Sequence, residues 1–565
     1  MKLRTMVCLL CATFATGASM KATEAQPEAE KRPKVGLVLG GGGARGFAHI
    51  GVIQWLEEQQ IPVDYVAGTS MGGLIGALYA MGYTPQEMTE LVGDLSWEEL
   101  MAAAPPYRDL TFRRKEDSRQ YPVRLELGWN KGLATPSGLN PGHFIGLLFD
   151  RLSLPYWELD DFDDLPIPFR CVATDMEKGE AVVLDSGSLA MALRATMAIP
   201  GVFTPVEIDG KLLADGGVLD NLPVGTAKEM GAEIIIAVDV GSPLSDRAAL
   251  ESFLGLVNQS ITIMMLDKVR QNMRLADILV VPELKGYETL DFKDFDKIRV
   301  QGFLGAEDKN LVLRAFSIDD QNWKEHLAAR ASRRKDVIPT PNSVQVTGTD
   351  VGRESKLATK LTPFSNTELD ADLLEDELTA EYGRGRDYSL GYGLDGTAPN
   401  PALHVRVREK TYGPPFINLG LNINGSEMDN IRFGIRGRVT FMDLGRTGSE
   451  LRFDGALGTP AVLATEYYAP LKKGFFLAPR AIYHRDNRNY FENGDQLANY
   501  RIRNAGAGMD LGYGFGLRSD EIRFGYAISS LDAGVKKGEP ILPTLEGASG
   551  QFSLRWRHDS LDHPV

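Results

Sequence analysis

A serine enclosed by glycines is the first residue of this chain whose surroundings suggest chemistry. Ser70 lies in Gly68-Thr69-Ser70-Met71-Gly72, a G-x-S-x-G sequence between an extended apolar run and a small, apolar segment of helical character. A strand that turns sharply into a helix presents such a serine at the turn, and the glycines leave room for strained backbone and substrate. The sequence therefore predicts that Ser70 is a nucleophile, with Gly68 and Gly72 supporting its turn.

A glycine run upstream supplies a second part of the same chemistry. Residues 35–39 are apolar throughout and lead into Gly40-Gly41-Gly42-Gly43-Ala44-Arg45-Gly46. Main-chain N–H groups at a turn that opens a helix can hold the negative oxygen of a tetrahedral intermediate. The run therefore complements Ser70.

The same glycines also permit another interpretation. Gly41, Gly43 and Gly46 fit G-x-G-x-x-G, which indicates a dinucleotide site when it follows a strand. That site requires an acidic residue at the end of the second strand, whereas Asp64 precedes that strand. A dinucleotide site is therefore disfavoured, and a tight-turn serine without chemistry remains the simpler alternative.

A nucleophilic serine needs a base, and histidine is scarce near it. Only His49 and His143 occur in the catalytic region, and both are interpreted as core or helix-face residues. Asp215 ends an apolar run and precedes Gly216-Gly217, so its carboxylate lies at a turn that another element can approach closely. An apolar surrounding would raise its basicity enough to accept the serine proton. An ordinary Asp-Gly turn is the alternative.

These segments, in this order and spacing, resemble the patatin-like phospholipases over about residues 35–240. The resemblance is carried by the glycine run, the elbow around Ser70, residues 192–203 (ALRATMAIPGVF) and the Asp-Gly-Gly turn. It implies a Ser-Asp dyad in place of a triad, with Ser70 as nucleophile and Asp215 as general base. The shortage of histidine is then expected.

The resemblance also implies an oxyanion hole from the main chain of Gly41, Gly42 and Gly43, with Arg45 shaping that loop. The chain departs from the family at Thr196, where the S-x-A-x-P segment commonly has serine. This position lies outside the dyad, so catalysis is expected to be retained. We expect neither a metal nor a cofactor, because no cluster has zinc-site spacing and no segment fits an EF-hand loop.

An α/β domain is expected to position these residues, because short apolar runs alternate with helical stretches from residue 33 to about 282. We assign residues 26–331 to a three-layer α/β hydrolase domain. Residues 95–139 form a mixed stretch that could cover the site as a lid. The expected strands are residues 35–39, 65–68, 169–174, 181–185 and 233–240. The expected helices are residues 48–59, 73–81, 141–152, 188–197, 223–230 and 248–275.

Length and composition indicate an exported, multidomain protein. The chain has 565 residues, which suggests three or four domains, and a formal charge of −15, which gives no support to a nucleic-acid partner. Residues 1–25 have the positive start, apolar middle and small residues of a signal peptide. A lipoprotein anchor is disfavoured because Leu10 precedes Cys11. Outside this segment Cys171 is the one cysteine, so no disulfide framework is expected.

After residue 331 the pattern changes twice. Residues 332–341 are charged and contain two prolines, as expected for a linker. Residues 342–412 read as strand (343–348), helix (366–382) and two further strands (387–392 and 402–408), an order that resembles a POTRA module.

Residues 413–565 have the pattern of an outer-membrane β-barrel. Segments of about ten residues alternate in polarity between turns, and their charged residues are expected to face the lumen. A soluble β-sandwich is the alternative. The turn at 444–451 and residues 559–564 resemble the Omp85 and two-partner-secretion barrels, and the whole order resembles the type Vd autotransporters.

The expected barrel contains too few strands. Only about eight or nine strand candidates follow residue 415, and an open sheet would expose unpaired backbone to lipid. We favour an incomplete barrel in a fragment. A small barrel, or one closed between chains, is the alternative.

The sequence thus predicts a lipid acyl hydrolase of the phospholipase A or lysophospholipase type, acting through an acyl-enzyme. The expected substrate is a phospholipid or another fatty acyl ester, and outer-membrane lipid is the expected surrounding of the barrel. The hydrolase domain would be displayed at the surface or secreted, with the periplasm as the alternative, and a homodimer stays open. The alternatives are an outer-membrane assembly or transport protein whose patatin-like region only binds lipid, and a thioesterase or general lipase.

Overall fold

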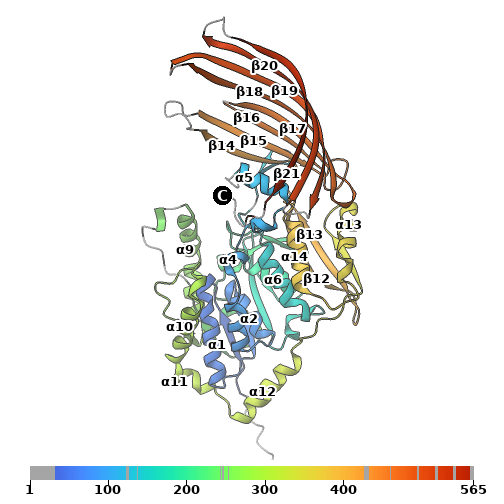
Figure 1. The fold of residues 1–565 in the computed structure, drawn as a ribbon. Coiled ribbons are helices and arrows are strands. Elements are labelled where there is room, and N and C mark those ends of the chain that lie inside the picture. Colours follow the sequence, from blue (N-terminus) through green and yellow to red (C-terminus); the bar gives the residue numbers. More distant parts are fainter. Residues whose placement is uncertain are drawn as a thin grey trace, which may run out of the picture.

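The computed structural model describes residues 32–561, except for segments at 122–125, 137, 242–243, 245–246, 248, 252, 425–431, 459, 493–494, 516–519, 539–542 and 560. The signal peptide expected at residues 1–25 lies outside the described residues. Figure 1 shows an α/β domain, a small module with helices and strands, and a large curved sheet. Among the described helices, none is both long and apolar enough to span a bilayer.

The α/β domain is built on a mixed sheet of eight strands in the order β10-β9-β1-β2-β5-β8-β7, with β6 paired to β5. The strands from β10 to β5 are parallel, whereas β6, β7 and β8 are antiparallel to their neighbours. The strands are β1 (Val35–Leu39), β2 (Tyr65–Thr69), β5 (Phe169–Asp175), β6 (Glu180–Leu184), β7 (Val206–Ile208), β8 (Lys211–Asp215), β9 (Ile234–Val238) and β10 (Ile278–Val280).

Two apolar cores, one on each face of this sheet, make the domain three-layered. The larger core packs α1, α2, α6, α7 and α10 against one face, and the smaller packs α8 and α9 against the other. The three-layer α/β fold predicted from the sequence is confirmed. The helices are α1 (Ala48–Glu58), α2 (Met71–Ala80), α6 (His143–Ser153), α7 (Leu189–Thr196), α8 (Val224–Glu229), α9 (Phe253–Met273), α10 (Phe295–Glu307) and α12 (Asp320–Arg333).

The small module contains one more helix than the sequence predicted. Its order is β11 (Ser343–Thr347), α13 (Val351–Leu361), α14 (Ala371–Tyr382), β12 (Asp387–Asp395) and β13 (Ala402–Glu409). β13 is the central strand, parallel to β11 and antiparallel to β12. The additional helix is α13, which precedes the predicted one and which the sequence analysis missed. A POTRA assignment for residues 342–412 remains a prediction.

The module shares its core with the α/β domain through α6. Leu147 and Leu154, from α6 and the turn that follows it, belong to the same buried cluster as the module's leucines. Asp150 of α6 accepts the Tyr392 N–H at 2.8 Å and pairs with Arg406 at 2.7 Å. The two parts are therefore packed together, not merely linked.

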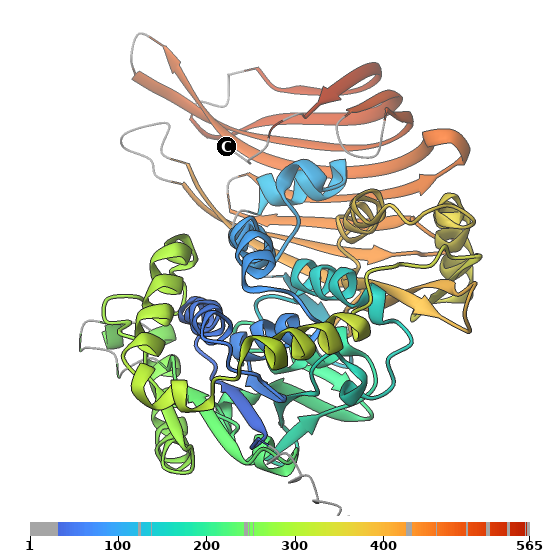
Figure 2. The same cartoon turned by 90° about the horizontal axis from the view of Figure 1, so that it is seen from below.

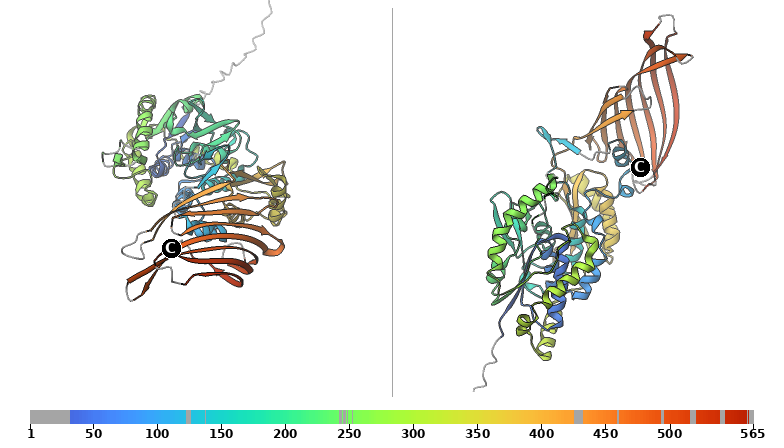
Figure 3. Two further views of the ribbon diagram at one scale, coloured as in Figure 1. Left: turned by 90° about the horizontal axis from the view of Figure 1, so that it is seen from above. Right: turned by 90° about the vertical axis from the view of Figure 1, so that its left-hand side faces the viewer.

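The C-terminal sheet is antiparallel and open among the described residues. Eight consecutive strands, β14 to β21, form its main part. The large antiparallel sheet predicted for this region is confirmed, and Figure 3 shows its curvature. Its strands are β14 (Phe416–Asn424), β15 (Arg432–Met442), β16 (Glu450–Leu457), β17 (Ala461–Pro470), β18 (Phe475–Glu492), β19 (Asp495–Phe515), β20 (Asp520–Gly538) and β21 (Leu545–His558).

Residues 95–139, considered as a lid, include two strands of this sheet. β3 (Glu126–Trp129) pairs with β14, and β4 (Leu133–Ala134) pairs with β3, so the sheet has ten strands. α5 (Phe112–Gln120) lies against the inner face of the sheet, as Figures 1 and 2 show. The helix contains many charged residues, and buried ion pairs to the sheet hold it there.

Candidate active site

Ser70 lies at a sharp turn between β2 and α2. β2 ends at Thr69, α2 begins at Met71, and Ser70 between them has φ 55° and ψ −126°. A positive φ is uncommon for a residue with a side chain and costs conformational energy, so surrounding packing must hold it. The turn predicted around Ser70 is therefore present, in the geometry of a nucleophile elbow.

The five glycines next to the predicted site residues each lie against another element. A Cβ atom built at any of these glycines would collide with a neighbouring atom, because it would lie less than 3.0 Å from it. The nearest atoms to such a Cβ would be Met71 Cγ at 2.4 Å for Gly46, Gly72 O at 2.4 Å for Gly68, Leu39 O at 2.2 Å for Gly72, Val172 O at 2.2 Å for Gly216, and Asn221 Oδ1 at 2.9 Å for Gly217.

The sheet brings Asp215 to Ser70 across a single strand. Thr69 of β2 is in register with Val172 of β5, and the next residue of β5, Ala173, is in register with Asp215 of β8. The Asp215 carboxylate accepts the Gly217 N–H at 2.8 Å, and the nearby Ser70 hydroxyl favours its charged form. The two residues proposed as a dyad thus lie together.

The environment of Asp215 favours its neutral form. Its side chain is buried, and this burial raises its pKa to about 6, although the Ser70 hydroxyl and the Gly217 N–H favour the charged form. A carboxylate with a pKa close to the working pH can accept a proton and return it. The site therefore has the electrostatics of a general base.

Thr196, the departure from the family pattern, supports the elbow. Its hydroxyl accepts the Ser70 N–H at 3.0 Å and donates to Val172 O at 2.6 Å. The residue is fully buried at the end of α7, and its methyl group lies against Gly73. The sequence analysis treated Thr196 as incidental because no local pattern shows which main-chain group its hydroxyl meets.

In the glycine loop, residues 40–46, the N–H groups that could bind an oxyanion are those of Gly42 and Gly43. The Gly41 N–H already donates to Asn221 O at 3.1 Å, and Asn221 Nδ2 donates back to Gly41 O at 3.0 Å. Gly42 and Gly43 are partly exposed, and in the part of the chain that the structure describes their N–H groups have no acceptor. Of the three glycines predicted to form the oxyanion hole, these two have free donors.

Arg45 binds main-chain carbonyls from four positions. Its guanidinium donates to Val240, Leu284 and Tyr287 at 2.8 Å and to Gly241 at 2.9 Å. These carbonyls follow β9 and β10, so Arg45 joins the glycine loop to the ends of two neighbouring strands. The role in shaping the loop that the family resemblance implies for Arg45 remains a prediction, and these contacts are ones that could perform it.

Neither histidine contacts the pair. His49 Nε2 donates to Gly40 O at 2.7 Å, and His143 Nδ1 accepts the Leu390 N–H at 3.2 Å. Burial lowers their pKa values to about 4 and about 3, respectively. Both are core residues. Within the described residues, no group of three or more His, Cys, Asp or Glu is placed to hold a metal ion.

Comparison with known proteins assigns a family to the part of the chain that contains this site. Residues 37–228 match the family described as patatin-like phospholipase. These residues form a patatin-like α/β domain. The match includes the glycine loop, the Ser70 elbow, Thr196 and Asp215, so the resemblance noted in the sequence is confirmed.

Curated relatives of the patatin-like domain are longer proteins. Lysophospholipase NTE1 of Meyerozyma guilliermondii is 31% identical over 299 residues, covering 48% of this chain and 19% of that protein. Patatin-like phospholipase domain-containing protein 6 of Mus musculus is 29% identical over 422 residues, covering 67% of this chain and 28% of that protein. The chain thus spans less than a third of the length of these relatives.

Solved structures show only weak likeness to the whole chain. BamA from Haemophilus ducreyi lacking POTRA domains 1–3 gives a TM-score of 0.31 at 17% identity, over 40% of this chain and 45% of that one. VipD from Legionella pneumophila gives a TM-score of 0.30 at 16% identity, over 54% of this chain and 74% of that one. Scores of this size do not assign a fold to the parts outside the patatin-like domain.

Proposed function

We propose that the protein hydrolyses fatty acyl esters of lipids, with Ser70 as nucleophile and Asp215 as general base. The observation that carries the proposal is the position of Ser70, at a strained turn beside the glycine loop and one strand away from the buried Asp215 carboxylate. The names of the relatives, lysophospholipase and patatin-like phospholipase, support a phospholipid or lysophospholipid as substrate.

The reaction follows from the positions of these groups. Ser70 Oγ attacks the ester carbonyl while its proton passes to the Asp215 carboxylate. The N–H groups of Gly42 and Gly43 hold the oxyanion, and Asp215 returns the proton to the leaving alcohol. Water, deprotonated by Asp215, then attacks the acyl-enzyme, and Asp215 passes that proton to Ser70 Oγ as the bond to the acyl group breaks and the fatty acid leaves.

We propose further that the C-terminal sheet lies in an outer membrane. Along β20 and β21 exposed apolar residues alternate with buried or paired charged ones, which is the pattern of strands with one face in lipid. Export by residues 1–25 and the division into a hydrolase domain (26–331), a POTRA module (342–412) and a membrane sheet (413–565) belong to the same proposal. The large exposed apolar residues on these strands are Phe524, Tyr526, Ile528, Leu545, Phe552, Leu554 and Trp556.

The test is release of fatty acid from phospholipid vesicles by the purified full chain. Ser70→Ala and Asp215→Asn are compared with Ser332→Ala and Asp296→Asn, which make the same chemical changes at exposed positions. We expect loss of at least about a thousandfold in the first two, because they remove the nucleophile and its base. The two control variants should retain the wild-type rate.

Equal rates in all five proteins would leave only a lipid-binding role for the patatin-like domain. An acyl thioester offered in place of the phospholipid separates the remaining enzyme classes. Faster cleavage of the thioester, with the same dependence on Ser70, would assign a thioesterase and reject the phospholipase assignment.

A further inference from the structure

α5 is a charged helix in a buried place. Its sequence, FRRKEDSRQ, has one apolar residue, Phe112, yet Arg113, Lys115 and Asp117 are 5%, 2% and 8% exposed. Charged side chains are rarely buried unless they are paired, so a helix of this composition cannot pack on an ordinary apolar core. It requires a surface that supplies complementary charges.

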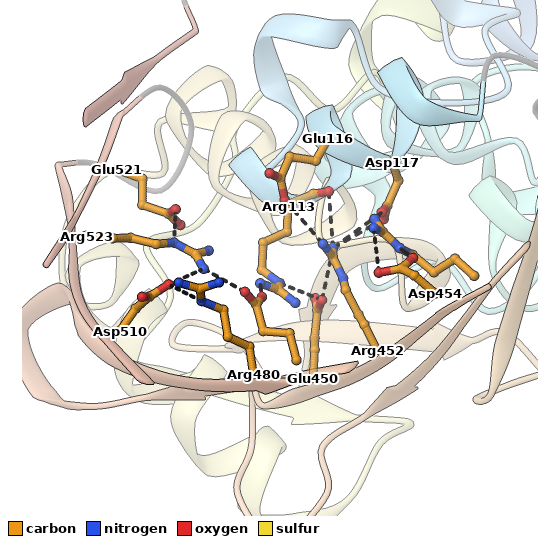
Figure 4. Close-up of polar contacts among 12 residues, drawn as sticks. Arg113, Glu116, Asp117, Glu450, Arg452, Asp454, Arg480, Asp510, Glu521 and Arg523 are labelled. Atoms are coloured by element: carbon orange, nitrogen blue, oxygen red, sulfur yellow. Dashed lines mark hydrogen bonds and ion pairs between the residues drawn. The ribbon is translucent and has the colours of Figure 1, made fainter. Parts of the chain in front are cut away.

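The inner face of the C-terminal sheet supplies them. Arg113 pairs with Glu450 and Glu466, each at 2.7 Å, and Asp117 pairs with Arg438 at 2.6 Å. Figure 4 shows α5 above the curved sheet, with the side chains of Arg113, Asp117 and Glu450 between them. The partners lie on β15, β16 and β17, so α5 contacts three successive strands.

The ion pairs continue across the sheet as one connected network. It contains eight arginines and seven carboxylates in the described residues, so its charges nearly cancel. A surface built for a free anion would carry an excess of cations. The members are Arg113, Arg114, Glu116, Asp117, Arg438, Glu450, Arg452, Asp454, Glu466, Arg480, Asp510, Glu521, Arg523, Arg555 and Arg557.

The segments before and after α5 contact the two opposite edges of the eight strands β14 to β21. Before α5, the Tyr107 hydroxyl donates to Asp559 at 2.7 Å, directly after β21. After α5, β3 pairs with β14, and Lys410 and Tyr412 bond Glu126 of β3. The stretch from 101 to 139 thus contacts the first of these strands and the residues that follow the last one.

Both ends of this stretch return to one residue of the patatin-like domain. Asn140 Nδ2 donates to Met101 O at 2.8 Å, and the Asn140 N–H donates to Val202 O at 2.8 Å. Val202 lies in the segment between α7 and β7, and Ala198 of that segment accepts the Asp215 N–H at 2.9 Å. The stretch therefore leaves the patatin-like domain and returns to it at the same place.

We propose that residues 101–121, 126–136 and 138–139 form a docking arm and that the inner face of the C-terminal sheet is the binding surface for its helix α5. The arm holds the patatin-like domain on the sheet by a second connection, independent of the chain link through residues 332–341 and the small module. The hydrolase domain then stays attached to the sheet and works beside it, and it is not released as a free enzyme. This inference does not depend on the chemistry of Ser70.

Trypsin reports whether α5 is docked, because the helix carries its own cleavage sites. Lys115 is 2% exposed in the docked arm, and a protease needs an exposed, locally unfolded chain to cut. The experiment follows cleavage after Lys115 in the full chain in phospholipid vesicles. Glu450→Arg changes the sheet, Arg113→Glu changes the helix, and Glu492→Arg makes the first change at an exposed position.

We expect wild type and Glu492→Arg to resist cleavage after Lys115 while the exposed Lys335 is cut. Glu450→Arg and Arg113→Glu should each raise the rate after Lys115 more than about tenfold, because each reverses a buried charge and places it among like charges. Arg503 lies within β19, so resistance to cleavage after Arg503 shows that the sheet remains folded, and cleavage there shows that it has unfolded. Where a sheet variant fails this check, Arg113→Glu decides, since it leaves the sheet unchanged.

Two results would overturn the docking arm. One is cleavage of wild type after Lys115 as fast as after Lys335. The other is unchanged resistance at Lys115 in both Glu450→Arg and Arg113→Glu with intact strands. Neither readout involves lipid hydrolysis, so an inactive Ser70 site would leave this test unaffected.

Discussion

The Ser70 main-chain N–H donates a hydrogen bond of 3.0 Å to the Thr196 hydroxyl. The same hydroxyl donates to Val172 O at 2.6 Å. One buried side chain thus joins the nucleophile turn to β5, the strand that separates Ser70 from Asp215. The elbow has a strained φ, and this tie is one of the contacts that hold it.

Thr196→Val should therefore weaken both stability and catalysis. Valine has the same shape but leaves the Ser70 N–H and Val172 O buried without partners, which costs about 1–3 kcal/mol for such a group. We expect a lower free energy of unfolding and a lower kcat with little change in KM. Denaturant unfolding and initial rates on phospholipid vesicles measure the two effects.

Thr196→Ser is the matched control for that variant. It keeps the hydroxyl and loses only a methyl group, so its free energy of unfolding should fall by less than about 1 kcal/mol. Most of its activity should remain. Equal losses in the serine and valine variants would show that the methyl contact with Gly73, not the hydroxyl, is what matters.

The activity should depend on pH through Asp215. A general base must be deprotonated, and burial raises the pKa of Asp215 to about 6. We therefore expect kcat/KM to fall about tenfold per pH unit below this pKa and to level off above it. A profile that stays flat from about pH 7 to about pH 4.5 would contradict the assignment of Asp215 as base.

Asp215→Asn should make the folded protein more stable at neutral pH. Because the folded pKa is about 6 and the ordinary pKa of an aspartate is 3.8, the stabilising contribution of Asp215 is complete below about pH 4 and disappears as pH rises through about 6. The shift corresponds to about 3 kcal/mol. Asparagine does not titrate, so the variant does not lose this stability as pH rises.

Unfolding of wild type and Asp215→Asn at about pH 4 and about pH 8 checks this sign. The variant's advantage should grow with pH, and Asp296→Asn, at an exposed position, should show no such trend. An advantage that shrinks toward alkaline pH would mean that the folded site favours the charged carboxylate.

Gly72→Ala should disrupt the elbow, whereas Gly146→Ala should not. A Cβ at Gly72 would lie 2.2 Å from Leu39 O, a main-chain atom that cannot move away cheaply, while a Cβ at Gly146 meets nothing within 4 Å. Alanine within a helix gains about 0.5–1 kcal/mol over glycine. Thermal unfolding should show a large loss for the first variant and a small gain for the second.

The sequence predicted the patatin-like domain well because its signals are local. The run 35–39 and the glycine-enclosed Ser70 are each continuous stretches whose strand and turn can be inferred from neighbouring residues. Asp215 was found in the same way, from the turn that follows it. The long-range pairing of Ser70 with Asp215 came from the family resemblance, since spacing alone does not give sheet register.

The contacts of α5 could not be predicted because its signals are non-local. FRRKEDSRQ has no apolar stripe, so its pattern indicates a solvated helix, and its burial follows only from charges that lie more than three hundred positions away. Thr196 and Asn221 were missed for a related reason, because their partners are main-chain groups of other elements. Neither kind of contact leaves a pattern in the local sequence.

Arg45→Met should loosen the glycine loop without touching Ser70 or Asp215. The guanidinium holds four carbonyls, of Val240, Gly241, Leu284 and Tyr287, and methionine fills similar volume with no donor. Since carbonyls left unpaired in a buried site cost about 1–3 kcal/mol each, the loop should move to regain partners. The N–H groups of Gly42 and Gly43 would move with it, so kcat should fall about a hundredfold or more, as when one oxyanion donor is lost.

Arg45→Lys and Arg314→Met separate this cause from a general loss of charge. Lysine keeps the charge but has a single ammonium group with three donors, so it cannot reach all four carbonyls, and it should restore only part of kcat. Arg314 is exposed, and its substitution should leave kcat unchanged. Full activity in Arg45→Lys would mean that charge near Asp239, rather than the fork of hydrogen bonds, positions the loop. Full activity in Arg45→Met would remove Arg45 from the account of the oxyanion hole altogether.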